Sequence, residues 1–382
     1  MQIVDNKLCC GCGACADACP KKCIAMDYNE YGFLMPIVGE GCVDCGLCKK
    51  VCPAQNPIQR EEIKAVYKGY RKEKEKDADK ESSSGALFPA LAEKIISEQG
   101  VVVGAVFEDG FKNVKHVLVE DMTGVESCRG SKYIQSQTAG IYEKTKRALK
   151  DGRKVLFSGT PCQIAGLKGF LRADYDNLYT MDFICHGVAS TAYWQAFLES
   201  VADGKKLAYV SFRNKDNGFT SSGIKIVTDD GVTLVEEPIA QEPIFGKAFA
   251  NNLLARDSCG GCQYAARTRC ADITLADNMI DCTDEEKKKG SSFIFINTQK
   301  GQALFDFVKA DLCAEEKDAA EIIAKMMHLN GPAKPHKDRE KLLTAFKEKG
   351  VDEAKKYVTV YSAETPSLWV RIKAKIKRLL KR

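Results

Sequence analysis

The chain has 382 residues, of which 45% are hydrophobic and 18 are cysteine, and it carries a formal net charge of +5. This is too long for one small domain, and the hydrophobic content is sufficient for a globular core. Residues 368–382 contain seven basic and no acidic side chains, so the rest of the chain is slightly acidic and we expect no nucleic-acid-binding surface on it.

The first ten residues, MQIVDNKLCC, show no sign of a targeting segment, because they lack the basic and then apolar pattern of a secretion signal. The apolar run at residues 101–107 is far too short to span a bilayer. Cysteines stay reduced in the cytoplasm, where they serve metals and redox chemistry, so the composition predicts a cytoplasmic protein.

Residues 9–52 contain two copies of one cysteine pattern, CxxCxxCxxxCP. This is the bacterial spacing for a [4Fe-4S] cluster, in which three thiolates of one copy hold a cube and the fourth ligand crosses from the other copy. Structural zinc needs only one CxxC pair per half-site, and disulfides need an oxidising compartment. The pattern therefore predicts two clusters, the first held by Cys9, Cys12, Cys15 and Cys52 and the second by Cys42, Cys45, Cys48 and Cys19.

This segment resembles a two-cluster bacterial ferredoxin over about residues 1–57, which implies a small α+β ferredoxin-like domain. We expect residues 26–38, between the two copies, to form a hairpin. Two further cysteines of the segment, Cys10 and Cys23, lie outside the pattern.

Strands and helices alternate after the linker at residues 55–60. We expect strands at residues 65–70, 101–107, 116–120, 155–157 and 182–185, and helices at residues 87–99, 138–150, 162–171 and 193–201. Such alternation predicts an α/β domain with a largely parallel sheet.

The segment from Val155 to Cys162 has residues that are typical of a strand, a turn and the start of a helix. Its strand ends at Ser158 and Gly159, Thr160 can cap the next helix, and proline suits the first helical position. Free N–H groups at such a strand end attract anions, so a flavin phosphate or ring edge would fit there. Cys162 lies in the first helical turn, where we expect a lowered pKa and a reactive or metal-binding thiol.

The next expected strand repeats this arrangement, because it ends at Cys185 and is followed by His186. If the two strands are neighbours, Cys162 and Cys185 face one crevice. His186 is a candidate proton donor, with a structural histidine as the alternative. The nucleotide fingerprints GxGxxG and GxxxxGK[ST] are both absent from the sequence.

Several motifs in matching order resemble the beta subunit family of coenzyme F420 hydrogenases and dehydrogenases over about residues 64–310. They are SSSGALF at 82–88, RGSKYIQS at 129–136, VLFSGTPCQ at 155–163, DFICHG at 182–187, CxxC at 259–262, DITLAD at 272–277 and Asn297-Thr298. The resemblance implies a flavin, usually FAD, beside iron–sulfur centres. It also implies electron transfer between ferredoxin-like carriers, a deazaflavin such as F420 or other partners, and a substrate. Some relatives belong instead to polysaccharide biosynthesis.

The cofactor contacts that we expect come from three segments, although the segment at 128–136 could also be an ordinary surface loop. The chain departs from the family pattern at Ala86, where a second glycine is usual, and at Asn278 and Met279, where an aromatic pair is usual. The expected contacts are Ser84, Gly85, Arg129, Ser131, Lys132, Gln135, Ser136, Ser158, Gly159 and Thr160.

The cysteines of the α/β part have three interpretations. In the first, a third [4Fe-4S] cluster is held by Cys162, Cys185, Cys259 and Cys262. In the second, zinc is held by Cys259, Cys262, Cys270 and Cys282. In the third they bind no metal, since free cysteines are often small buried residues.

The C-terminal segment at 368–380 has an apolar stripe at helical spacing and basic residues on its other face. Such a helix can lie on an anionic membrane surface, so residues 366–382 are a candidate peripheral contact with the inner membrane. The alternatives are a helix packed on its own domain or docked on an acidic partner.

We expect five units in the chain and a flavoprotein oxidoreductase that relays electrons from a ferredoxin-type donor through two clusters to FAD and a substrate, with Cys162 and His186 as candidate catalytic residues. The alternatives are a non-catalytic electron-transfer subunit of a partner enzyme and a flavin-less interaction protein. The units are 1–57, the ferredoxin domain; 58–81, linker and first strand; 82–255, the flavin-binding domain; 256–345, its C-terminal part with the CxxC motif; and 346–382, the helical tail.

Overall fold

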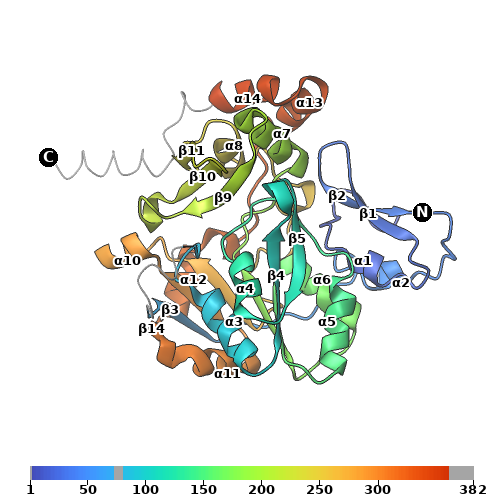
Figure 1. Cartoon of the computed structure of the whole chain (residues 1–382). Helices are drawn as coiled ribbons and strands as arrows, with labels where there is room; N and C mark the ends of the chain where they lie inside the picture. Colours follow the sequence, from blue (N-terminus) through green and yellow to red (C-terminus); the bar gives the residue numbers. More distant parts are fainter. Residues whose placement is uncertain (1, 73–80, 361–382) are drawn as a thin grey trace.

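The computed structural model describes residues 2–72 and 81–360. A small N-terminal region packs beside a nine-stranded central sheet, and an upper layer is built on a three-stranded sheet (Figure 1). The predicted basic helix at 366–382 lies outside the described residues. Within the described part, no helix combines the length and the apolar character needed to cross a membrane.

The N-terminal region contains one small unit twice, a glycine with positive φ followed by a four-residue helix. The φ angles are 76° at Gly13 and 70° at Gly46, a conformation that glycine adopts without strain. Between these units two strands pair antiparallel, which confirms the predicted hairpin. The elements are α1 (Ala14–Asp17), β1 (Ile24–Tyr28), β2 (Leu34–Val38) and α2 (Leu47–Lys50).

The central sheet is mixed, and the expectation of a largely parallel sheet is therefore wrong. Four of its eight strand pairings are parallel within the described residues, and three of these join the central strands β12, β8, β7 and β4. Outside these central strands the pairings are antiparallel except that of β5 with β6. A short turn joins β4 to β5, and β3 pairs antiparallel with both β13 and β14. The order is β14 (Leu312–Lys317), β3 (Ala65–Arg71), β13 (Ser292–Ile296), β12 (Ile273–Asp277), β8 (Leu178–Phe183), β7 (Val155–Ser158), β4 (Val101–Phe107), β5 (Val114–Val119) and β6 (Ser136–Gln137).

Helices cover both faces of the sheet because apolar side chains alternate along its strands. Val101 and Phe157 belong to a core with α5 and α6, whereas Val102 and Leu156 belong to a second core with α3 and α11. The predicted helices at 87–99, 138–150 and 162–171 are thus confirmed as α3, α5 and α6. The helices are α3 (Leu87–Ser97), α4 (Met122–Cys128), α5 (Ile141–Lys150), α6 (Pro161–Leu171), α9 (Asp257–Gly260), α10 (Asp284–Lys289), α11 (Gln299–Val308) and α12 (Ala319–Lys325).

The upper layer has its own aromatic core, in which Trp194, Phe197, Phe212 and Phe245 are fully buried. Its sheet is antiparallel in the order β11-β10-β9, and it places β9 near the central sheet (Figure 1). The helix predicted at 193–201 is confirmed as α7. The elements are α7 (Thr191–Ala202), β9 (Leu207–Asn214), β10 (Gly223–Thr228), β11 (Thr233–Pro238), α8 (Phe245–Ala250), α13 (Arg339–Lys349) and α14 (Val351–Val360).

Candidate functional site

The eight pattern cysteines form two groups, and each group mixes the two copies of the pattern. Burial raises the pKa of Cys15 to about 12, with smaller contributions from the neighbouring thiols of Cys9 and Cys52. The crossed ligand assignment predicts these two groups. A small cavity of about 20 Å³ in the N-terminal region is lined by Cys19, Cys23, Cys42, Cys45 and Cys48, among others.

Cys10 and Cys23, which lie outside the pattern, are nevertheless beside it. The Sγ atoms of Cys23 and Cys19 are 3.4 Å apart. Cys10 lines a much larger cavity in the α/β part and is within electrostatic reach of Cys12 and Cys162. Sequence spacing alone gave no role to either residue.

The loop that carries the first cysteines is fixed to the α/β part by its carbonyl groups. Arg256 Nε donates to the carbonyl of Cys9 and Gln135 Nε2 to that of Cys10, both at 2.7 Å. The Cys12 carbonyl accepts from the hydroxyls of Thr138 and Tyr142, also at 2.7 Å. The first cysteine group is therefore held against the large cavity. On the other side, Cys45 of the second group is exposed.

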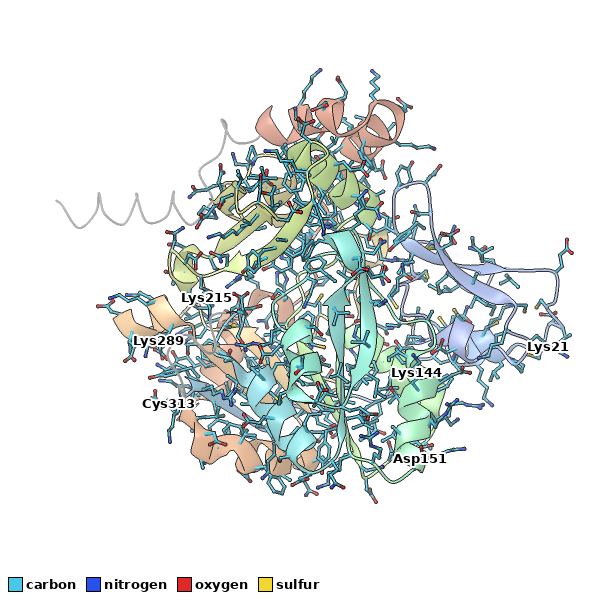
Figure 2. The ribbon with its side chains drawn as sticks, in the orientation of Figure 1. Lys21, Lys144, Asp151, Lys215, Lys289 and Cys313 are labelled. Carbon is cyan, nitrogen blue, oxygen red and sulfur yellow. The ribbon has the colours of Figure 1, made fainter. Side chains whose placement is uncertain are left out.

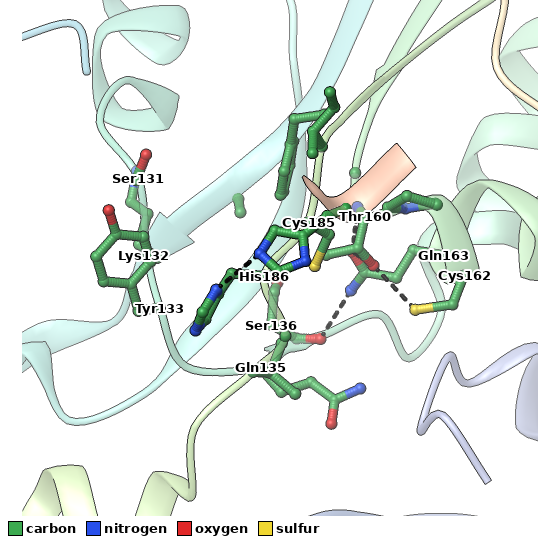
Figure 3. Close-up of a pocket in the computed structure, with 18 of the residues that line it drawn as sticks. Ser131, Lys132, Tyr133, Gln135, Ser136, Thr160, Cys162, Gln163, Cys185 and His186 are labelled. Carbon is green, nitrogen blue, oxygen red and sulfur yellow. Dashed lines mark hydrogen bonds between the residues drawn. The ribbon is translucent and has the colours of Figure 1, made fainter. Parts of the chain in front are cut away.

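The large cavity has a volume of about 850 Å³ and lies beyond the carboxyl ends of β7 and β8 (Figure 3). Small-molecule sites span roughly 300–1,000 Å³, so a ligand as large as a dinucleotide is within range. Nine of the ten expected cofactor contacts line it. The exception is Gly85, whose N–H donates to Ser292 Oγ at 3.0 Å and whose Cα packs against the Gly69 carbonyl.

The turn after β7 has the predicted form. Thr160 precedes α6 with Pro161 at the first helical position. The expectation of free N–H groups is wrong, because the Gly159 N–H donates to the Met181 carbonyl at 3.1 Å and the Thr160 N–H to Gln163 Oε1 at 3.0 Å. Beside it, His116 bonds through Nδ1 to Ser136 Oγ at 2.7 Å and through Nε2 to the Ser158 carbonyl at 3.0 Å. Burial lowers the pKa of His116 to about 4, so it is neutral and holds both serines in place.

Sequence reasoning missed His116, because a histidine inside an apolar strand has no motif around it. The nearest signal was its position in the predicted strand at 116–120, next to the segments expected to contact a cofactor.

Four cysteines line the large cavity together, namely Cys162, Cys185, Cys259 and Cys262. Burial raises the pKa of Cys185 well above its ordinary value, and the other three thiols raise it further. The lowered pKa expected for Cys162 is wrong for the free thiol. A hydrogen bond with the Cys10 thiol and burial raise the pKa of Cys162 well above its ordinary range.

Throughout residues 2–72 and 81–360, no group of three or more Cys, His, Asp or Glu side chains is arranged to hold a single metal ion. The thiolates of a [4Fe-4S] cube each bind a different iron and lie further apart, so a cluster is a different requirement. The zinc interpretation has no geometric support. Cys282 Sγ donates to the Asn278 carbonyl at 2.7 Å, and Cys270 is buried with its Sγ 3.4 Å from the Pro161 carbonyl.

His186 lies in the cavity wall directly after Cys185 (Figure 3). Its Nδ1 is 3.1 Å from Nε2 of His328, and its ring packs at 5.1 Å from that of Phe249. Burial lowers the pKa of His186. His328, which sequence reasoning did not single out, therefore belongs to the same wall.

Two expected cationic contacts are already engaged within the protein, and the side chains of this region are drawn in Figure 2. Lys132 Nζ donates to the carbonyls of Arg129 at 2.6 Å and Cys128 at 3.2 Å, and burial lowers its pKa to about 8. Arg129 Nε donates to Ser82 Oγ at 3.2 Å. By contrast, Arg213 of β9 has two buried N–H groups in this cavity that lack a hydrogen-bond partner within the described residues. A ligand with an anionic group fits such a lining.

Paired tetra-cysteine groups beside a ligand-sized cavity in an α/β domain define an iron–sulfur redox protein. Residues 8–56 match the family model of the 4Fe-4S dicluster domain, which supports two clusters. Residues 152–322 match the model for the C terminus of the coenzyme F420 hydrogenase/dehydrogenase beta subunit. The C-terminal part of the chain, over residues 152–322, is thus similar to the F420 hydrogenase/dehydrogenase beta subunit family and is preceded by a dicluster domain, as the motifs predicted.

Two relatives show how the similarity is distributed. The coenzyme F420-dependent sulfite reductase of Methanocaldococcus jannaschii is 24% identical over 312 residues, which are 81% of this chain and 47% of that protein. The chain thus spans about half the length of this relative. An uncharacterized ferredoxin of the same organism is 36% identical over 72 residues, 19% of this chain and 92% of the ferredoxin.

A chain from the F420-reducing [NiFe] hydrogenase complex of Methanosarcina barkeri is a distant structural neighbour. It is 19% identical, with a TM-score of 0.47, and the match covers 78% of this chain and 91% of that chain. A score in this range does not establish a common arrangement.

Proposed function

We propose that this chain is an iron–sulfur flavoprotein oxidoreductase that passes electrons from a ferredoxin-type donor through two [4Fe-4S] clusters to FAD. The observation that carries the proposal is the position of the first cysteine loop against the wall of the large cavity. Cys10 lines the large cavity, and its carbonyl accepts a hydrogen bond from Gln135, which lines the same cavity. The first cluster would therefore lie within electron-transfer distance of a ligand bound there.

The position of the two clusters gives the relay a direction. Cys45 is exposed and Val43 beside it is 59% exposed, so the second cluster would face a donor. Cys12 is buried against the α/β part. Electrons would therefore enter at the second cluster and leave from the first.

A bound flavin would supply the step between single electrons from the clusters and electron pairs for a substrate. The residues of this chain would bind and orient it. His116 fixes the hydroxyl of Ser136 and the carbonyl of Ser158, and Gly159 and Thr160 line the cavity beside them. Cys162 and His186 face the same space and are the candidate catalytic residues.

As the alternative to a catalytic role for Cys162, we further propose that Cys162, Cys185, Cys259 and Cys262 hold a third [4Fe-4S] cluster. They come from three separate segments, and the buried thiols interact electrostatically with one another. Such a cluster would supply a further one-electron step at the large cavity. Cysteines 259 and 262 then have the CxxC spacing of a half-site.

The acceptor is proposed by analogy alone. Because one relative is an F420-dependent reductase, the deazaflavin F420 is a candidate electron carrier for this chain, and a redox protein is a candidate partner. Turnover with dithionite-reduced protein and F420 would distinguish an enzyme from an electron-transfer subunit that needs a partner.

The decisive experiment is anaerobic purification followed by quantitation of iron, sulfide and flavin on one sample. We expect FAD with about twelve irons per chain, or about eight if only the dicluster domain is loaded. The Cys185→Ser variant should lose about four irons and keep the dicluster signals, with Cys313→Ser, an exposed cysteine outside the cavity, as the control. Iron without flavin after reconstitution with FAD would overturn the flavoprotein proposal.

A further inference from the structure

Arg213 offers the cavity an edge of hydrogen-bond donors, with Tyr133 and Asp277 as its neighbours. It lies on β9, its side chain is 13% exposed, and its Nη1 bonds to Asp277 Oδ2 at 2.7 Å. Its Nε and Nη2 atoms are buried and lack a hydrogen-bond partner within the described part of the chain. Buried donors without a partner are rare because their desolvation is costly, so the arrangement itself indicates a missing acceptor.

These two atoms form one side of the guanidinium plane. Their N–H bonds run parallel, which is the geometry that arginine uses to bind a carboxylate or phosphate through two oxygens. Asp277 holds the opposite corner of the group. The Phe219 ring lies 5.5 Å from the guanidinium carbon and limits its rotation. The edge is therefore preorganised before a ligand arrives.

The charge of Arg213 is permanent. Burial opposes ionisation, but the neighbouring Tyr133 and Asp277 raise the pKa of Arg213 above its ordinary value. By comparison, the nearby ammonium of Lys132 donates to backbone carbonyls and is only partly charged above pH 8. Arg213 is thus the better anion anchor of the two.

We propose that the Nε and Nη2 edge of Arg213 binds a phosphate group of the flavin nucleotide in the cavity. This inference rests on the proposed function and deepens it, because it assigns the phosphate end of the ligand to β9 of the upper layer.

The test compares three flavins that share one ring and differ in phosphate, namely riboflavin, FMN and FAD, by anaerobic fluorescence titration of deflavinated protein. Arg213→Gln should weaken FMN and FAD by about 10- to 100-fold and leave riboflavin unchanged. Arg213→Lys should lie between, because an ammonium keeps the charge but loses the paired geometry. Arg267→Gln is the matched control, since Arg267 is exposed and donates to Asn330 outside the cavity.

A second variant separates binding from folding. Arg213→Gln leaves Asp277 without its partner, so Arg213→Gln with Asp277→Asn removes both charges, and it should show the same selective loss with unchanged iron content. An equal loss for riboflavin would assign Arg213 a structural role and overturn the inference. If the variants keep their affinity for all three flavins, only the inference about Arg213 is overturned. If the wild-type protein binds none of the three flavins, the flavoprotein proposal is overturned.

Discussion

Gly166 of α6 lies so close to Cys12 of the N-terminal region that a Cβ added to it would stand 2.9 Å from Cys12 Sγ. A side chain at this position would displace a proposed cluster ligand. The absence of a side chain on α6 therefore sets how closely the dicluster domain approaches the cavity.

Gly166→Ala should disturb the first cluster and spare the second. The added methyl pushes on Cys12 Sγ, so we expect an altered electron paramagnetic resonance signal from one cluster only. The signal of the second cluster in the same sample is the internal control. Identical spectra for wild type and Gly166→Ala would contradict the close approach.

Replacing Arg256 by glutamine should lower the midpoint potential of the first cluster. Arg256 is a buried cation that donates to the carbonyls of Cys9 and Leu34, so its removal destabilises the more negative reduced cluster. A change on the order of 50 mV, about 1 kcal/mol, is expected at a typical protein dielectric. A redox titration of both clusters measures it, with the second cluster as internal control. An equal shift in both would argue against a local charge effect.

His116 should make the folded protein sensitive to acid. The pKa of His116 is lowered to about 4 by burial, against about 6.5 in an unfolded chain. Between these values the unfolded chain binds a proton that the folded protein does not, so stability falls as the pH drops through this window.

At pH 5 this effect amounts to roughly 2 kcal/mol relative to pH 7. Anaerobic urea unfolding at both pH values measures it. In His116→Gln the difference between the two free energies of unfolding should shrink by about that amount, whereas His336→Gln, outside the cavity, should behave as wild type. Equal pH dependence with and without His116 would refute the assignment.

Gly85→Ala should reduce stability without changing flavin affinity. A Cβ at Gly85 would stand 2.6 Å from the Gly69 carbonyl of β3, and overpacking of this kind costs roughly 1–3 kcal/mol. Thermal unfolding and flavin titration on the same sample separate the two effects. Weaker flavin binding with unchanged stability would instead support the prediction from the sequence that Gly85 contacts the cofactor.

The sequence predicted those parts of the site that depend on local spacing. The cysteine pattern is complete within residues 9–52, and the strand, turn and helix around Thr160 follow from capping preferences within a few neighbouring residues. The lining at Ser136 and Ser158 could be anticipated because each lies in a motif. In these cases the residues that form one part of the site lie within one short segment of the chain.

The remaining features depend on contacts between distant segments. β3 lies between β13 and β14, and no periodicity in residues 65–70 indicates that these strands pair with it. Arg213 comes from a strand with no motif, and it becomes significant only because Asp277 and the cavity lie beside it. The pKa of Cys162 was misjudged for the same reason, since Cys10 lies 152 positions earlier in the chain.

The bond from Arg256 to Cys9 joins residues 247 positions apart, and it constrains the order of assembly. During synthesis the cysteine-rich segment leaves the ribosome first, well before the segment that holds its loop exists. Contacts of such long sequence separation form late in folding. Iron–sulfur assembly factors could therefore reach the cysteines of the first group before Arg256 locks that loop against the cavity wall, after which access closes.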